Sequence, residues 1–260
     1  MRVHHLNCGT MRPALTPGGL VCHVLLVQTG DGLLLVDSGF GLRDAADPAR
    51  RIGGARHLIR PVLDDSETAS RQVQRLGHDP AAVRDIVLTH GDADHTGGLA
   101  DFPHARVHLT AAESDAVQRP RTRNERYRYR PAQREHGPHL VEHEPSAGDG
   151  WRGFAAATEI RPGVVLIALP GHTRGHAAVA VDAGDRWILH AGDAFYHRGQ
   201  IDGATPVPRM LAGSERMIAH DRALVRANHA RLAELWASAD PSLTIVNAHD
   251  PELLRRARSR

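Results

Sequence analysis

Residues 88–98, LTHGDADHTGG, bring two imidazoles and two carboxylates together within six positions. The four side chains are His90, Asp92, Asp94 and His95, and they follow an apolar run and precede a glycine pair. Imidazole nitrogen and carboxylate oxygen both suit zinc, and carboxylate-rich sets also suit iron or manganese. A polar loop is the alternative explanation, but the spacing favours a metal site.

Three further strand-like runs end in residues of the same chemical types, at His172 in ALPGH, Asp193 in LHAGD and His249 in VNAHD. Side chains at strand ends and in the following loops converge on one rim of a sheet. Two adjacent ions that share one bridging carboxylate would let water lose a proton near neutral pH and attack a polarised carbonyl or phosphoryl group. The seven candidate ligands are His90, Asp92, Asp94, His95, His172, Asp193 and His249.

Short apolar, β-branched runs bounded by Gly, Asp or Pro recur and predict strands of a largely buried sheet. A capped segment at 65–77 predicts a helix, and the apolar spacing over 215–238 predicts one amphipathic helix packed on a sheet. An irregular, Arg/Tyr-rich insertion lies between, at about 118–160. The order of elements predicts one domain over residues 1–260, with two sheet-and-helix halves packed face to face. The predicted strands are 21–28, 32–39, 85–90, 105–110, 163–170, 177–184, 186–193 and 243–250.

Composition limits the class of partner. The 260 residues carry a net charge of only +2 with histidines neutral, so no nucleic-acid partner is expected. Cys8 and Cys22 cannot build a disulfide framework, the N-terminus lacks the layout of a signal peptide, and no apolar run is long enough to span a bilayer. We therefore expect a soluble, cytoplasmic protein that does not bind membranes.

The ordered set HGDADH (90–95), PGHTRGH (170–176), HAGD (190–193) and NAHD (247–250) resembles the metallo-β-lactamase superfamily, whose usual signature is HxHxDH followed by His, Asp and a final His. The resemblance runs from LLLVDSG (33–39) and is closest in pattern to the N-acyl homoserine lactonases. It implies an α/β fold, an αββα sandwich of two mixed sheets flanked by helices, with two divalent ions at the sheet edges. By resemblance, the first ion takes His90, Asp92 and His172, the second takes Asp94, His95 and His249, and Asp193 bridges them.

Asp92 stands where the family signature has a histidine. Three carboxylates and one hydroxide carry about four negative charges against four positive charges on two divalent ions, whereas a histidine would leave the cluster near +1. A less positive site lowers the pKa of its water less and slightly favours harder metals, and flavodiiron proteins resemble this chain in carrying an acid there. We expect two divalent ions, with zinc preferred and iron or manganese as open alternatives.

Further roles follow from the same resemblance. In the lactonases a tyrosine in a place similar to Tyr196 helps to hold the substrate carbonyl as an oxyanion partner, although Tyr196 could also be a core residue. Asp37 and Thr89 are candidates for orienting the ligating imidazoles, and His176 for packing beside the site. Asp37 could instead simply cap a turn.

Two loops could form the walls of the cleft. Seven arginines lie between Arg119 and Arg134 in the insertion, which is either a solvated helix or loop, or a segment over the cleft that offers Tyr127, Tyr129 and an arginine to an acyl chain or a carboxylate. All 32 basic residues are arginines, so such a cluster carries less information than usual. The loop at about 9–20 could form the opposite wall, with His23 near it.

These observations predict a dinuclear metal-dependent hydrolase that cleaves a lactone or carboxylic ester of a small molecule by attack of a metal-bridging hydroxide. The metals and Tyr196 would stabilise the oxyanion, and Asp94 would help to move the proton to the leaving oxygen. The alternatives are a glyoxalase II-like thioesterase and a non-hydrolytic metal-binding or redox member of the superfamily. An apolar edge of the 215–238 helix could pair two copies into a homodimer.

Overall fold

The apolar runs form two six-stranded mixed sheets in the computed structural model, which describes residues 1–259 but only the backbone of residues 146–149. The first sheet is antiparallel from β1 to β3 and parallel from β3 to β6, in sequence order; the second is antiparallel except for the parallel pair β11 and β12. The first sheet contains β1 (Arg2–Met11), β2 (Leu20–Thr29), β3 (Gly32–Val36), β4 (Val83–Val87), β5 (Arg106–Thr110) and β6 (His139–His143). The second contains, in spatial order, β12 (Leu243–Val246), β11 (Trp187–His190), β10 (Ala177–Asp182), β9 (Val164–Ala168), β8 (Phe154–Arg161) and β7 (Ser146–Trp151).

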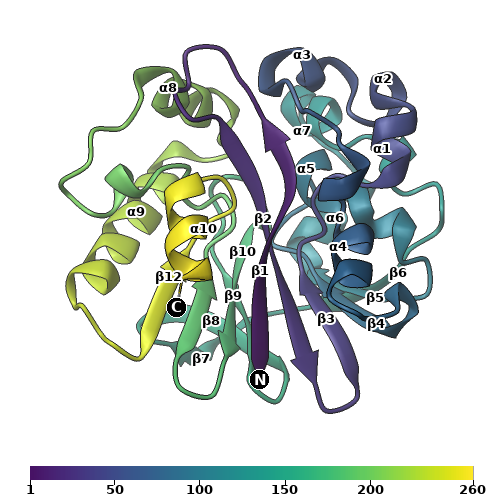
Figure 1. The fold of residues 1–260 in the computed structure, drawn as a ribbon. Coiled ribbons are helices and arrows are strands. Elements are labelled where there is room, and N and C mark those ends of the chain that lie inside the picture. The colour runs from purple at the N-terminus through teal and green to yellow at the C-terminus, as the bar shows by residue number, and fades with distance from the viewer. Residues whose placement is uncertain (260) are drawn as a thin grey trace.

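Helices cover the outer face of each sheet and complete the predicted αββα sandwich (Figure 1). On the side of the first sheet lie α1 (Leu42–Ala46), α2 (Pro48–Arg51), α3 (Arg56–Ile59), α4 (Ala69–Arg75), α5 (Ala93–Thr96), α6 (Ala111–Gln118) and α7 (Arg123–Arg128). On the side of the second lie α8 (Arg209–Ile218), α9 (Arg222–Ala237) and α10 (Pro251–Arg258). None of the helices in residues 1–259 combines the length and the apolar character needed to cross a bilayer.

Strand β3 shows why the strands of these sheets have continuous apolar sequences. Leu33 and Leu35 pack in a cluster with residues of α4, on the helix side of the sheet. Leu34 and Val36, which alternate with them, pack in a cluster with residues of β9 and β10 of the other sheet. Both faces of the strand are therefore buried, and a strand buried on both faces carries no polar alternation.

The predicted helix over 215–238 is wrong in one respect: the chain forms two helices with a break at residues 219–221. The break is stabilised by two contacts, because the backbone N–H of His220 donates to the carbonyl of His172 and that of Asp221 donates to Gly171. Asp221 also caps the first turn of α9 through its side chain. The interruption thus fastens the loop that carries His172.

The insertion at 118–160 is not irregular, contrary to expectation. It contains α7, strands β6 and β7 and most of β8. Strand β1, at the edge of the first sheet, was not predicted either. Its burial is partial and its sequence, RVHHLNCGTM, shows little apolar periodicity, so its place depends on pairing with β2.

Candidate metal centre

The candidate ligands lie at one edge of the two sheets because they follow the carboxyl ends of strands. His90 follows β4, His172 follows β9, Asp193 follows β11 and His249 follows β12. Asp92 and α5 then add the remaining donors, since Asp92 is the N-cap of that short helix. The convergence of all seven predicted ligands at one sheet edge is the arrangement by which α/β folds assemble sites.

The first set of candidate ligands consists of His90, Asp92 and His172. Oδ2 of Asp92 lies 3.3 Å from Nε2 of His90 and 3.4 Å from Nε2 of His172. Oδ2 of Asp193 lies 3.4 Å from Nε2 of His172 and 3.9 Å from Nε2 of His90. These donor atoms lie close enough together to surround one ion.

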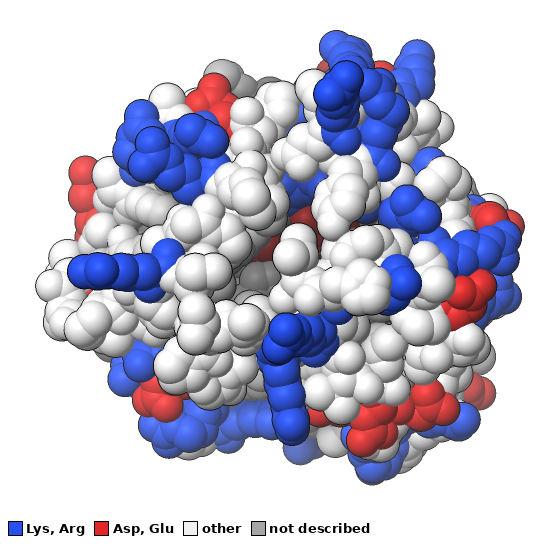
Figure 2. All heavy atoms as spheres, turned by 90° about the horizontal axis from the view of Figure 1, so that it is seen from above, with Lys and Arg blue, Asp and Glu red and all other residues white. Residues whose placement is uncertain are grey.

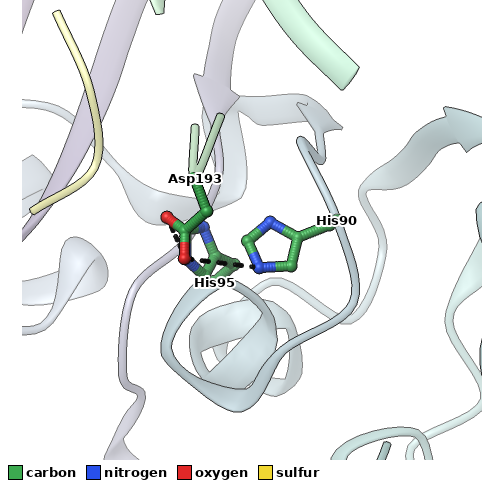
Figure 3. Close-up of side chains that lie close together, drawn as sticks. All are labelled: His90, His95 and Asp193. Carbon is green, nitrogen blue, oxygen red and sulfur yellow. Dashed lines mark ion pairs between the residues drawn. The ribbon is translucent and has the colours of Figure 1, made fainter. Parts of the chain in front are cut away.

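The second set consists of Asp94, His95 and His249. Oδ2 of Asp94 lies 3.5 Å from Nε2 of His249 and 3.9 Å from Nε2 of His95. The other oxygen of Asp193, Oδ1, lies 3.1 Å from Nε2 of His249 and 3.4 Å from Nε2 of His95. Oδ2 of Asp193 also lies 3.1 Å from Nε2 of His249. Asp193 therefore lies between the two sets, and Figure 3 shows it against an imidazole from each set.

Three buried polar atoms at this centre have no hydrogen-bond partner among the described residues. They are Nε2 of His90, Nε2 of His95 and Oδ1 of Asp193. Buried polar atoms are normally hydrogen-bonded, so such a group needs an explanation. Imidazole nitrogens and carboxylate oxygens that face one another in a buried centre are the donors that zinc and related divalent ions take. The residues fit a divalent metal.

Asp37 orients two of the imidazoles, as the resemblance suggested. Its Oδ2 lies 2.8 Å from Nδ1 of His95 and also accepts from the hydroxyl of Thr89, 2.8 Å away. The same hydroxyl lies 3.1 Å from Nδ1 of His90 and accepts its N–H, because its own proton goes to Asp37. Both Nδ1 atoms thus carry protons, and Nε2 of each ring is the nitrogen directed at the centre.

Backbone groups fix the other side of the centre. Nδ1 of His249 donates to the carbonyl of Val21, 2.8 Å away, so its Nε2 faces Asp193. His176 accepts the backbone N–H of Asp193 through Nε2 and donates from Nδ1 to the carbonyl of Leu169. The pKa of His176 is well below its usual value, mainly because the ring is buried. His176 is therefore a neutral group that positions Asp193.

Glu113 holds the two loops that carry the first set, and no sequence motif marks this residue. Its Oε1 accepts the backbone N–H of Gly91 and the hydroxyl of Tyr129. Its Oε2 accepts the hydroxyl of Thr173 and the backbone N–H of Gly175. A Cβ atom at Gly175 would lie 2.0 Å from the backbone nitrogen of Glu113, so only glycine allows this close approach.

Arg128 is the member of the arginine-rich stretch that enters the centre. Its Nε and Nη2 donate to the two oxygens of Asp92, and Nη2 also contacts Nε2 of His172. Burial alone would raise the pKa of Asp92, but Arg128 and the neighbouring imidazoles hold it well below its usual range. Burial and Arg128 lower the pKa of His172 to about 3. Tyr127 is half-exposed on α7 and does not take part.

Tyr196 lies beside the centre at the wall of a cavity. Its hydroxyl is 3.4 Å from Nδ1 of His172, and its ring packs edge-on against His172 and His249. Burial raises the pKa of Tyr196 well above its usual value, so the hydroxyl keeps its proton at neutral pH. The cavity of about 380 Å³ is lined by Tyr196, His249, Leu211 and the loop residues 16–20, which therefore form one wall. His23, expected near that wall, is instead buried against other histidines.

Figure 2 shows the face of the molecule that is uppermost in Figure 1, seen from above. A hollow lies near its middle, with acidic atoms at the bottom and mostly uncharged side chains around the opening. Arginine side chains gather farther out on this face. A small molecule would thus meet a mostly uncharged entrance before it reached the charged centre.

A family model described as the metallo-β-lactamase superfamily matches residues 17–241. The chain belongs to the metallo-β-lactamase superfamily. A probable metallo-hydrolase of Mycobacterium tuberculosis is 55% identical over 262 residues, which cover 99% of this chain and 83% of that protein. An N-acyl homoserine lactonase of a Bacillus species is 25% identical and covers 77% of this chain and 76% of that protein. Because these relatives are named as hydrolases, we conclude that the chain is a hydrolase of this superfamily.

A solved structure gives the same fold at low sequence identity. An N-acyl homoserine lactone hydrolase, with the product N-hexanoyl-L-homoserine at its catalytic metal centre, superposes with a TM-score of 0.68 at 22% identity. The match covers 98% of this chain and 95% of that one. At this identity the likeness establishes the metallo-β-lactamase fold of the two sheets.

Replacing Asp37 by Asn should weaken metal binding about 10- to 100-fold while the fold is kept. Asn accommodates the left-handed backbone at position 37, where φ is 59°, but its amide N–H₂ opposes the donors of Thr89 and His95. Competition with a chromophoric chelator measures the affinity, and circular dichroism checks the fold. Asp185→Asn, at an exposed ion pair with Arg186, is the control and should leave the affinity unchanged. An unchanged affinity in Asp37→Asn would show that Asp37 does not tune the ligands.

Metal uptake should release protons at neutral pH. Burial lowers the pKa of His249, but Asp193 and Asp94 outweigh it and raise the pKa to about 9, and they and Asp37 raise that of His95 well above normal. These imidazoles must lose protons to bind a metal, so the apparent affinity should rise with pH and level off above about 9. In metal-free protein the stabilisation from the charged His249 is present below pH 6.5 and lost as pH rises through about 9.

Calorimetric zinc titrations in buffers of different ionisation enthalpy count the released protons. We expect at least one proton to be released at pH 7 by the ion that binds Asp94, His95 and His249, and fewer at pH 10. Uptake without any proton release at pH 7 would contradict the assignment of charged imidazoles.

Proposed function

We propose that this chain is a dinuclear metal-dependent hydrolase that opens a lactone or cleaves a carboxylic ester of a small molecule. The observation that carries the proposal is the carboxylate of Asp193, which lies within 4 Å of imidazoles from both sets of candidate ligands. Bound divalent ions would lower the pKa of water to the neutral range and polarise the substrate carbonyl. The ligands would be His90, Asp92 and His172 for one ion, Asp94, His95 and His249 for the other, and Asp193 for both.

Two side chains of the chain would act directly on the substrate. Tyr196, which keeps its proton at neutral pH, would donate a hydrogen bond to the oxygen that becomes negative during attack. The side chains of Asp92 and Asp94 are each 15% exposed, more than that of Asp193. Arg128 binds Asp92 but does not bind Asp94. Asp94 is therefore the carboxylate placed to carry a proton to the leaving oxygen.

The relatives support the lactone or ester class over a thioester. Several relatives and similar solved structures are named as N-acyl homoserine lactonases or lactone hydrolases. A thioesterase of the glyoxalase II type would need free arginines for the carboxylates of glutathione. Several arginines of the arginine-rich stretch are instead paired within the chain, because Arg128 binds Asp92 and both Arg119 and Arg121 pair with Asp115. Zinc is the proposed metal, with iron or manganese as alternatives that elemental analysis of protein purified without added metal distinguishes.

The decisive experiment is a panel of lactones, carboxylic esters and thioesters. Each is assayed with metal-depleted protein and with protein restored with zinc, manganese or iron. We expect turnover of lactones or esters that depends on the metal. Metal-loaded protein that turns over none of them would contradict the proposal. A cytoplasmic location, and a homodimer that pairs near the exposed Met217 and Leu224, stay predictions.

Replacing Tyr196 by Phe should lower kcat/KM on the best substrate of the panel by about 100-fold, because one oxyanion donor is lost. Metal content should not change. Tyr127→Phe is the matched control, since its ring is half-exposed on α7, and it should keep the wild-type rate. Turnover by Tyr196→Phe within twofold of wild type would leave Tyr196 as a packing residue only.

A further inference from the structure

The two sets of candidate ligands differ in what already occupies them. In the first set, the guanidinium of Arg128 donates to both oxygens of Asp92 and contacts the Nε2 atom of His172. Those are the atoms that an ion would need from these two residues. A two-pronged contact between arginine and a carboxylate is among the strongest hydrogen-bonded pairs in proteins. The first set therefore already contains a cation.

The second set contains no guanidinium among the described residues. Nε2 of His95 has no hydrogen-bond partner, and neither does Oδ1 of Asp193, which faces this set. Nε2 of His249 has only the carboxylates of Asp193 and Asp94 near it. An ion at this set would satisfy two buried atoms that are otherwise unpaired, whereas in the first set Nε2 of His90 is the one such atom among the described residues.

The guanidinium is held in place by more than Asp92. Its Nη1 donates to the carbonyl of Ile218 at the end of α8, 2.7 Å away, and to the carbonyl of His172, 3.2 Å away. Asn124, one turn earlier on α7, donates to the same Ile218 carbonyl. The Arg128 side chain is only 6% exposed. These contacts make the arginine a built part of the centre that cannot swing freely into solvent.

We propose that Arg128 is a resident cation that competes with a metal ion for Asp92 and His172, so that the chain binds one divalent ion tightly at Asp94, His95, His249 and Asp193 and a second one only weakly. Entry of the second ion requires Nη2 to leave His172 and places two positive groups side by side. This inference rests on the metal centre of the proposed function, and it explains the acid at position 92. A neutral imidazole there would leave the buried guanidinium without a counter-charge.

Zinc titration of metal-free protein against a chromophoric chelator tests the proposal. The two stepwise constants of the wild type should differ by about 10- to 100-fold, the cost of losing one hydrogen bond between charged groups. In Arg128→Met the second step should tighten and this ratio should collapse toward that of two equal sites. Arg126→Met, on the exposed face of the same helix, is the matched control and should keep the wild-type ratio.

Two substitutions assign the steps to the sets. His172→Gln should remove the weak step and keep the tight one, and His249→Gln should remove the tight step. Arg128→Lys keeps the charge but cannot reach both partners with a planar fork, so the ratio should fall part of the way. This variant also serves if circular dichroism shows that Arg128→Met does not fold.

The outcomes separate the inference from the proposed function. Two wild-type ions with equal affinities would overturn the inference while leaving the dinuclear hydrolase in place. A ratio that neither Arg128 variant changes would also overturn it. Wild-type protein that binds no zinc, manganese or iron at all would instead overturn the metal centre on which both rest.

Discussion

Three carboxylates buried side by side are the constraint on which the rest of this structure depends. Asp92 lies within a few ångströms of two imidazoles, Asp94 of two others and Asp193 of all four, and the three carboxylates are largely out of solvent. Buried charges of one sign persist only where cations or hydrogen-bond donors face them. Two features of the chain balance these negative charges. Arg128 is a permanent cation, and the imidazoles face the carboxylates, so that bound protons or metal ions supply the remaining positive charge. The raised pKa of His249 and the lowered pKa of Asp193 both follow from the proximity of these charges.

The scaffold around the centre meets this constraint with fixed, mostly backbone, contacts. Asp37 fixes the Nδ1 side of one imidazole directly and of a second through Thr89, while Glu113 ties together the loops before Asp92 and after His172. Strand ends alone would place the ligands at a common edge but would leave ring orientation free. The break between α8 and α9 also positions the centre. Its backbone N–H groups donate to the loop that carries His172, and the carbonyl of Ile218, at the end of α8, accepts from Arg128. Ligand geometry is thus set by contacts from both halves of the sandwich.

Features that depend on local sequence, such as buried strands and the ligands that follow them, were predicted. Features that depend on contacts with residues far away in the sequence were missed. Two-sided burial makes the central strands continuous apolar runs, so β3 and β9 were readable, and the ligands follow such runs directly. Strands β6 to β8 were missed because they lie at or near a sheet edge and are only partly apolar. Glu113 is one acid among many, with nothing nearby in sequence to mark it. Arg128 could not be chosen from seven arginines in one stretch, since its partner lies 36 positions away.

That missed arginine changes the electrostatic argument about Asp92. Counted alone, an acid in place of a histidine makes the centre one charge less positive, which favours harder metals and a less acidic bound water. Asp92 and Arg128 together carry no net charge, as a neutral histidine would. The overall charge of the centre is therefore restored, and what remains of the difference is local: an oxygen donor instead of nitrogen, and a guanidinium beside one set but not the other. Because the positive charge is fixed at one side, the asymmetry acts on the relative affinity of the two sets more than on the acidity of water across the whole centre.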